Sequence, residues 1–293
     1  MELTTLRRGP GYPPMLAQLY DPPPQLFIRG RVELLVEPAV AVVGARSCSA
    51  YGAQVARMLG RELASAGLVV VSGLARGIDG EAHRGALDAG GPTVAVLGCG
   101  IDRDYPRAHA GLAELTRGNG AVVSEYPPGT EPAPWRFPAR NRIIAGLCLA
   151  TVVVEARERS GALITADFAL ELGREVFAVP GEITAALSAG TNDLLRQGAA
   201  PLLSPDDVLS ALGIEQPETP PPPVSDAAAS VLRFLTDTAC DFDGLVRRSG
   251  RSSAELAAVV VELELAGLVD EAEGVYRVRA RARSGTGLVA GAR

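Results

Sequence analysis

Short apolar runs alternate with amphipathic segments along most of the first 213 residues. The runs are rich in Val and Ala, which is typical of strands buried on both faces of a parallel sheet. The predicted strands are residues 26–29, 40–43, 69–72, 93–97, 121–124, 151–155 and 176–179, and the predicted helices are residues 50–65, 80–89, 106–117, 140–147 and 165–172. This alternation predicts an α/β fold with a Rossmann-like, doubly wound parallel sheet, whose ligands bind beyond the carboxyl ends of the strands.

Two proline-rich stretches suggest where the chain divides. Residues 1–35 contain a cluster of prolines and are predicted to form an extended N-terminal arm, which leads into the sheet domain of residues 36–213. Residues 214–225 include four consecutive prolines, a composition typical of a stiff linker. A small domain is predicted at residues 226–279, followed by a disordered tail at 280–293.

The small domain has the pattern of a winged helix. Three predicted helices, at residues 226–236, 241–248 and 252–266, precede a hairpin closed around Gly274. In many winged helices the third helix enters a DNA groove, but here it carries three glutamates and no arginine. Because phosphate contacts need cations, a protein contact or a structural role is the favoured interpretation.

Three strands end in small-residue turns that each begin a helix. The sequences are AVAVVGARSCSAYG (39–52), VVVSGLARGIDGEAH (69–83) and SGALITADFALELG (160–173), the last following the run at 149–155. The first turn of a helix has unpaired N–H groups and the positive end of the helix dipole, so it attracts anions. Three such turns at strand ends predict an extended polyphosphate ligand.

The charge of the chain favours a local binding site over a basic coat. The formal net charge is -6, and the sequence contains no lysine, so its 28 side-chain cations besides histidine are all arginines. Arginine suits bidentate phosphate contacts and stacking on bases, although a bias in genome composition explains its use equally well. Trp135 and Phe137 lie among arginines in a predicted surface loop, where Phe137 is the better candidate for base stacking and a hydrophobic plug is the alternative.

Several chemistries find no support in the sequence. The four cysteines are isolated and the two histidines have no second ligand at metal spacing, so neither a metal nor another cofactor is expected. No serine, histidine and carboxylate arrangement indicates catalysis, and no catalytic residue is predicted. The chain has no signal sequence or membrane-length apolar run, which predicts a cytoplasmic protein.

Eight segments together resemble the DNA-processing protein A family (DprA/Smf) of bacterial recombination mediators. They include AVVGARSCSAYG, VSGLARGIDGEAHRGAL, SEYPPGTEP, FPARNRIIAGL and VVVEARERSGALITADFALELGREVFAVPG, and the resemblance runs from Tyr12 to Val278. It implies a Rossmann-like domain that binds and protects incoming single-stranded DNA, forms a homodimer and helps to load RecA recombinase during natural transformation. The family is not known to be enzymatic, and its N-terminal helical domain is expected to be absent or truncated here.

The motifs give a predicted DNA-binding set. The arginine of the G-x-R turn, Arg46, is the residue that the resemblance assigns to the DNA backbone. The complete set is Gly44, Ala45, Arg46, Ser47, Ser72, Gly73, Arg76, Phe137, Arg140, Asn141, Arg142, Ser160, Gly161, Leu163 and Thr165. The dimer interface is expected within residues 193–212, whose leucines exceed what covering a sheet edge requires, unless they only complete the core.

An enzyme remains the alternative class. Nucleotide-processing proteins of the LOG and lysine-decarboxylase-like type share a related fold, but their PGG-x-G-T-x-x-E motif is missing and ERSGALITADF stands in its place. A dinucleotide-dependent dehydrogenase is less consistent still, because no G-x-G-x-x-G follows the first strand.

Overall fold

A computed structural model describes residues 3–214, 222–272 and 274–278 of the chain. The chain separates into two compact units, Met1–Gln216 and Pro217–Arg293. The predicted tail at 280–293 and most of the predicted linker lie outside the described residues. Within the described residues, no helix has both the length and the apolar character needed to span a membrane.

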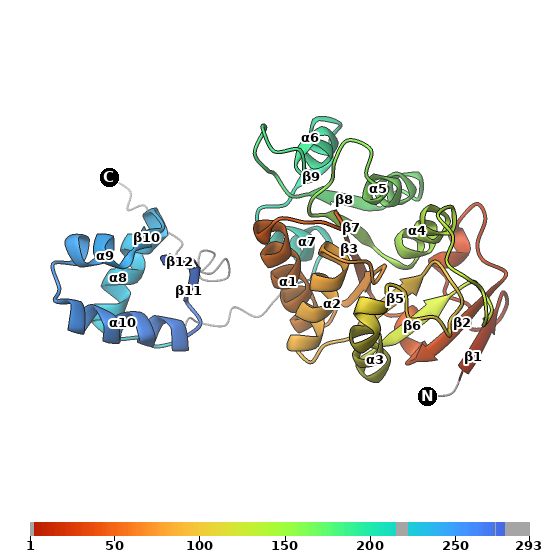
Figure 1. Cartoon of the computed structure of the whole chain (residues 1–293), viewed down its shortest axis with the longest axis horizontal. Helices are drawn as coiled ribbons and strands as arrows, with labels where there is room; N and C mark the ends of the chain where they lie inside the picture. The colour runs from red at the N-terminus through yellow and green to blue at the C-terminus, as the bar shows by residue number, and fades with distance from the viewer. Residues whose placement is uncertain (1–2, 215–221, 273, 279–293) are drawn as a thin grey trace. The chain divides into compact units, whose positions relative to one another are not determined.

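The first unit is built on one sheet (Figure 1). Its strands are β1 (Leu3–Arg7), β2 (Gln25–Gly30), β3 (Ala39–Val43), β4 (Val69–Ser72), β5 (Thr93–Leu97), β6 (Ala121–Ser124), β7 (Ala150–Val153), β8 (Glu175–Ala178) and β9 (Ala200–Pro201). They lie in the order β1-β2-β6-β5-β4-β3-β7-β8-β9. The strands from β6 to β9 in this order run parallel, whereas β1 and β2 are antiparallel additions at one edge.

The strand order makes this a doubly wound sheet, as predicted. The first parallel strand, β3, is central; β4, β5 and β6 follow on one side of it, and β7, β8 and β9 on the other. The winding direction therefore reverses beside β3, which is the position where ligands bind to such sheets.

Helices cover both faces of the sheet (Figure 1). They are α1 (Ala50–Ser65), α2 (Ile78–Asp88), α3 (Ala110–Asn119), α4 (Arg136–Leu147), α5 (Gly161–Glu171), α6 (Ala189–Arg196) and α7 (Pro205–Ala211). Because side chains alternate along a strand, Ala41 and Val43 of β3 pack in the core with α4 and α5, whereas Val40 and Val42 pack in the core with α1, α2 and α7.

Two helices begin four residues earlier than predicted. Helix α4 starts at Arg136, so the predicted loop around Phe137 is in fact the first turn of a helix. Pro138 is the third residue of α4, where its missing N–H has no intrahelical partner to lose. Helix α5 starts at Gly161 because the Ser160 hydroxyl caps it.

The predicted N-terminal arm is part of the sheet unit. Strands β1 and β2 pair with each other, and β2 pairs with β6. Between them, Tyr12, Leu16 and Leu19 are buried in the same core as α4 and α5. The arm expectation was therefore wrong for these residues, since their apolar side chains pack against the sheet unit despite the intervening prolines.

The leucines of residues 193–212 mostly complete the core. Leu194, Leu202, Val208 and Leu209 are buried, and among the leucines of this segment only Leu203 is largely exposed, at 76%. Packing in the core therefore accounts for most of the leucines in this segment, and a dimer interface is not needed to explain them.

The second unit is a winged helix, as predicted. It contains α8 (Asp226–Asp237), β10 (Cys240–Asp241), α9 (Phe242–Ser249), α10 (Ser253–Leu265), β11 (Val269–Ala272) and β12 (Val275–Val278), with the strand order β10-β12-β11. Gly250 ends α9 in the left-handed region at φ 63°, and Ser252 with Glu255 forms a capping box for α10.

A neutral histidine is built into the core of the first unit. The Thr93 hydroxyl donates to Val70 O (2.7 Å), so its oxygen accepts from Nδ1–H of His83 (2.7 Å). The other ring nitrogen of His83 is buried with no hydrogen-bond partner among the described residues. Burial lowers the pKa of His83 from 6.5 to about 3, because a charged ring would place an unpaired N–H in the core.

We expect acid to destabilise the first unit through His83. The unfolded chain binds the proton more tightly, so the stability from this residue is complete above pH 6.5 and is lost progressively as the pH falls toward 3. The variant His83→Asn keeps a donor for Thr93 and does not titrate. Thermal midpoints measured between about pH 7.5 and 4.5 should fall less steeply for this variant than for the parent chain; equal slopes would contradict the assignment.

Candidate nucleic-acid interface

The three small-residue turns lie at one edge of the sheet. They follow β4, β3 and β7, which are neighbours in the strand order. Because parallel strands end on the same side, the three turns, which begin at Gly44, Gly73 and Ser160, lie at a common edge. This is the carboxyl edge at which the winding direction reverses.

The first and second turns are packed against each other. The Ile78 N–H donates to Ala45 O (3.2 Å), and a Cβ on Gly77 would lie 2.2 Å from that same oxygen. Gly77 also has φ +73°, a backbone conformation that favours glycine. Both the close approach and the backbone conformation therefore require glycine at this position. With the backbone so confined, Arg46 and Ser47 remain exposed at the rim of the turn.

The N-terminus of α1 is closed by the chain's own carboxylate. Glu155, which follows β7 and is 5% exposed, accepts hydrogen bonds from the Ser49 N–H (2.9 Å) and the Ser49 hydroxyl. Ser49 in turn caps the helix by accepting from the Gly52 N–H (3.0 Å), and a Cβ on Gly52 would strike the carboxylate. The prediction of a free anion site at this first turn is therefore wrong, because a carboxylate already occupies it.

The N–H groups of the second turn are also occupied. Asp79 accepts from the Gly73 N–H (3.1 Å) and the Ala75 N–H (3.4 Å), and burial raises the pKa of its carboxyl group. The Ser72 hydroxyl donates to Val42 O (2.6 Å), joining β4 to β3. Ser72 and Gly73 are therefore buried and hydrogen-bonded within the protein, and they do not face solvent.

Arg140 is an internal brace. It is 4% exposed and donates to Gly73 O (2.8 Å) and Val96 O, so one guanidinium joins the carboxyl ends of β4 and β5. Burial lowers its pKa to about 10. Its neighbour Asn141 accepts from Arg140 Nε (3.1 Å) and donates to Gly161 O (2.9 Å), which fixes the start of α5.

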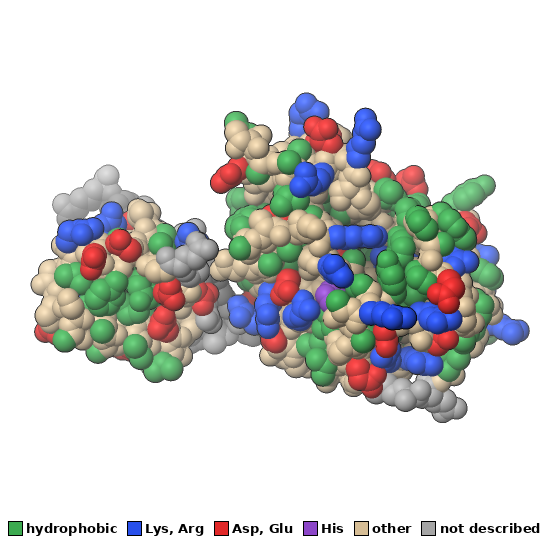
Figure 2. Space-filling view, in the orientation of Figure 1, with side chains coloured by type: hydrophobic (Ala, Val, Ile, Leu, Met, Phe, Trp, Pro, Cys, Tyr) green, Lys and Arg blue, Asp and Glu red, His purple; other side chains and the backbone are tan. Residues whose placement is uncertain are grey.

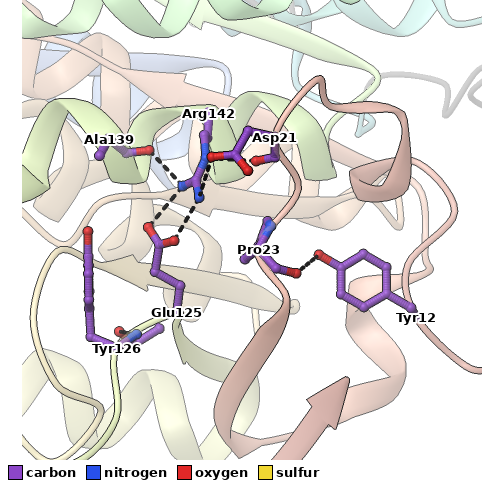
Figure 3. A network of polar contacts seen from close by, with 8 residues as sticks. Tyr12, Asp21, Pro23, Glu125, Tyr126, Ala139 and Arg142 are labelled. Carbon is purple, nitrogen blue, oxygen red and sulfur yellow. Dashed lines mark hydrogen bonds and ion pairs between the residues drawn. The ribbon is translucent and has the colours of Figure 1, made fainter. Parts of the chain in front are cut away.

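Arg142 points to the N-terminal segment (Figure 3). Its guanidinium forms two hydrogen bonds with the Glu125 carboxylate (2.9 and 2.7 Å) and one with Asp21 O (3.0 Å). The two ion-pair side chains are only 14% and 12% exposed. Beside them, the Tyr12 hydroxyl donates to Pro23 O (2.8 Å). Arg142 thus secures the N-terminal segment, and its sequence-predicted DNA contact would require this network to open.

Arg46 is held over an aromatic ring. Its guanidinium carbon lies 5.1 Å from the centroid of Phe137, and the Phe137 ring stacks on Tyr105 with centroids 5.3 Å apart. A Cβ on Gly98 would lie 2.8 Å from the Phe137 ring, so this glycine makes room for it. Among the residues that the structure describes, Arg46 has no carboxylate partner, which leaves its charge available.

Arg136 forms a second cluster of cation–π contacts, with two aromatic rings. Its guanidinium lies 4.6 Å from the ring centroid of Trp135 and 5.0 Å from that of Tyr126. It also donates to Glu131 O, which limits its movement. These contacts hold two rings in place beside the first turn of α4.

The third turn is partly accessible. The Ser160 hydroxyl accepts from the Ala162 N–H (3.3 Å), and Gly161 is exposed with open space where a Cβ would be. Thr165 is buried and Leu163 packs on the core. The beginning of this turn is therefore accessible to a ligand, and the half-buried Leu163 lines a cavity beside it.

We call the exposed surface at this edge the arginine–aromatic face. It consists of Arg46, Arg76, Tyr105, Tyr126, Trp135, Arg136 and Phe137. Figure 2 shows arginine side chains spread among hydrophobic ones over the visible side of the first unit. The described residues include no group of three or more His, Cys, Asp or Glu placed to hold a metal.

Four members of this face lie outside the predicted DNA-binding set, namely Tyr105, Tyr126, Trp135 and Arg136. Of these, Trp135 was considered for base stacking and ranked below Phe137. Tyr126 and Tyr105 follow β6 and β5, which end at the same edge as β3 and β4. Both tyrosines could have been predicted at this edge, because the residues that follow parallel strands all lie on the same side of the sheet.

We expect Glu155→Ala to expose the anion site at α1. Loss of the carboxylate leaves the Ser49 N–H and hydroxyl without their acceptor and should lower the free energy of unfolding by about 1–3 kcal/mol. Added sulfate should then raise the thermal midpoint of the variant more than that of the parent chain, because the anion refills the site. Glu158→Ala, which removes an exposed carboxylate after the same strand, is the control. An equal response to sulfate in both chains would contradict this account.

We expect Arg142→Ala to destabilise the first unit by about 3 kcal/mol, since it leaves Glu125 buried without its partner. Arg46→Ala should change stability by no more than about 0.5 kcal/mol, because Arg46 is exposed. Urea unfolding followed by circular dichroism measures both. If Arg142→Ala is as stable as Arg46→Ala, the network in Figure 3 does not secure the N-terminal segment.

Comparison with known proteins gives the family. Residues 4–213 match the model of the DNA recombination-mediator protein A family, and residues 215–274 match the DprA winged helix domain. The chain is 49% identical over 199 residues to the DNA processing protein DprA of Streptococcus pneumoniae, covering 68% of this chain and 70% of that protein. It is 42% identical over 277 residues to Protein Smf of Escherichia coli, covering 90% and 74%.

A solved structure agrees with these matches. The structure of DNA processing protein A from Helicobacter pylori, described for its single-stranded DNA binding mode, superposes with a TM-score of 0.66 at 31% identity, covering 72% of this chain and 96% of that one. Together with the family model over residues 4–213, these similarities show that the chain belongs to the DNA processing protein A (DprA/Smf) family.

Proposed function

We propose that this protein binds single-stranded DNA through the arginine–aromatic face and acts as a recombination mediator. The observation that carries the proposal is Arg46, an exposed cation held over Phe137 at the edge where the sheet changes direction. The H. pylori relative, whose structure concerns single-stranded DNA binding, supports it.

The chemistry of the face suits an unpaired strand. Guanidinium groups attract phosphates, and aromatic rings stack on bases that are not already stacked in a duplex. The net charge of -6 means that phosphate attraction must come from this local group. The third helix of the winged-helix unit, α10, contains glutamates and no arginine, so we assign the strand to the first unit.

Family membership supports the finer roles. We propose that the protein protects incoming strands and helps to load RecA during natural transformation, that it works in the cytoplasm, and that it does so as a homodimer. Linking two strand-binding faces in one particle would raise the effective concentration of the second face.

An enzymatic role on nucleotides is disfavoured. In Rossmann-type nucleotide enzymes the N-terminus of the first helix receives a phosphate. Here the Glu155 carboxylate is hydrogen-bonded at that position. A phosphate would have to displace a carboxylate and approach its negative charge, so we propose a binding protein without catalysis.

Titration of labelled oligonucleotides tests the proposal. Full-length protein should bind a single strand more tightly than a duplex, and ATP or NAD should not compete. Arg46→Ala should weaken single-strand binding by about 1–3 kcal/mol and reduce the salt slope by about one, as expected for one lost phosphate contact.

Arg31→Ala is the matched control. Arg31 is an exposed arginine that follows β2, next to the start of β6 and so at the opposite edge of the sheet. Equal affinities for Arg46→Ala and Arg31→Ala would remove Arg46 from the site. Displacement of the strand by ATP would favour the nucleotide enzyme instead.

A further inference from the structure

The most exposed ring of the arginine–aromatic face belongs to Trp135. Its residue is 63% exposed, whereas Phe137 is half-buried beside Gly98. The Phe137 ring is in contact with both Arg46 and Tyr105, so much of its surface is already occupied. The indole has Arg136 as its described ring partner and is otherwise open to solvent.

The indole is positioned by a fixed loop. The Gly100 N–H donates to Thr130 O (2.8 Å), and the Gly129 N–H donates to Asp102 Oδ1 (2.8 Å). Arg103 forms an ion pair with Glu131 (2.7 Å). These contacts attach the loop that precedes Trp135 to the segment that follows β5.

Arg136 extends this support to the indole itself. It lies between Trp135 and Tyr126 and donates to Glu131 O in the same loop. Most of the entropic cost of ordering the Trp135 ring is therefore incurred when the protein folds, and little of it remains when a ligand binds. A large apolar ring that is both exposed and fixed is suited to stacking on a planar ligand.

We infer that Trp135 is a second base-stacking position, which receives a nucleobase next to the part of the strand bound at Arg46 and Phe137. The inference rests on the proposed function and extends it, because the bound strand then runs from the sheet edge along the start of α4. The ligand at Trp135 is an unpaired base of any type, since every base has a stacking face. Arg136 is a positioning residue that keeps the indole in place.

The protein offers a direct probe, because Trp135 is its only tryptophan. Intrinsic emission therefore reports on this one position. On titration of the full chain with an oligothymidylate of about 20 nucleotides, the emission should be quenched with the same midpoint as the anisotropy of a labelled strand. Oligomers of about 4 nucleotides, at the lower end of known site sizes, should quench it less at equal saturation.

Substitution separates stacking from a distant change in emission. Trp135→Ala should weaken strand binding about 5- to 100-fold, which corresponds to one lost stacking contact. Trp135→Phe should recover most of the affinity. Leu115→Ala, which removes another exposed apolar side chain on α3, should have no effect. All variants should melt like the parent chain, because these side chains lie outside the core.

The outcomes distinguish this inference from the proposed function. If the labelled strand binds but Trp135→Ala has unchanged affinity, the second stacking position is wrong and the proposed function stands, whether or not the emission changes. If no strand binds even at low salt, the proposed function fails and the inference fails with it.

Discussion

The buried guanidinium of Arg140 determines the geometry of the functional edge. It joins Gly73 O and Val96 O, so the ends of β4 and β5 are held by a side chain from α4, a helix distant in sequence. A Cβ on Gly73 would meet this guanidinium, which explains the glycine. Asp79 on the same turn supplies a buried opposite charge, and a buried cation needs such a counterpart and full hydrogen bonding.

Three arginines of one helix carry out three different tasks. Arg140 is internal and braces the sheet edge, Arg142 is paired with Glu125 and secures the N-terminal segment, and Arg136 is placed between two aromatic rings at the surface. Arg136 and Arg140 are one turn apart on the same side of α4 and differ in burial, because Arg140 is 4% exposed whereas Arg136 lies at the surface. Arg142, two residues beyond Arg140, projects from a different side of the helix. The helix therefore connects the stability of the unit to the arginine–aromatic face, which is the proposed binding surface.

Glu155 changes what a Rossmann-like sheet can bind. Its carboxylate is bound at the start of α1, where related folds accept a phosphate. With that position closed, the edge offers guanidinium groups and aromatic rings in place of helix N–H groups. Such a surface makes contact along an extended chain and is less suited to enclosing one nucleotide.

The sequence by itself determined the local features of this protein. The apolar runs and turn signals predicted β2 to β8, α1 to α5 and the three helices and hairpin of the second unit, including α1 at Ala50–Ser65, because periodicity and capping are properties of neighbouring residues. They did not predict β1, β9 or β10. The turn motifs likewise placed Gly44, Ser72 and Ser160 at strand ends. The tertiary structure alone decided that Arg140 is buried and Arg142 is paired, since their partners lie 17 to 121 residues away in the sequence. It also decided that Glu155 closes α1 and that Trp135 is more exposed than Phe137, because these facts arise only when separate segments fold against one another.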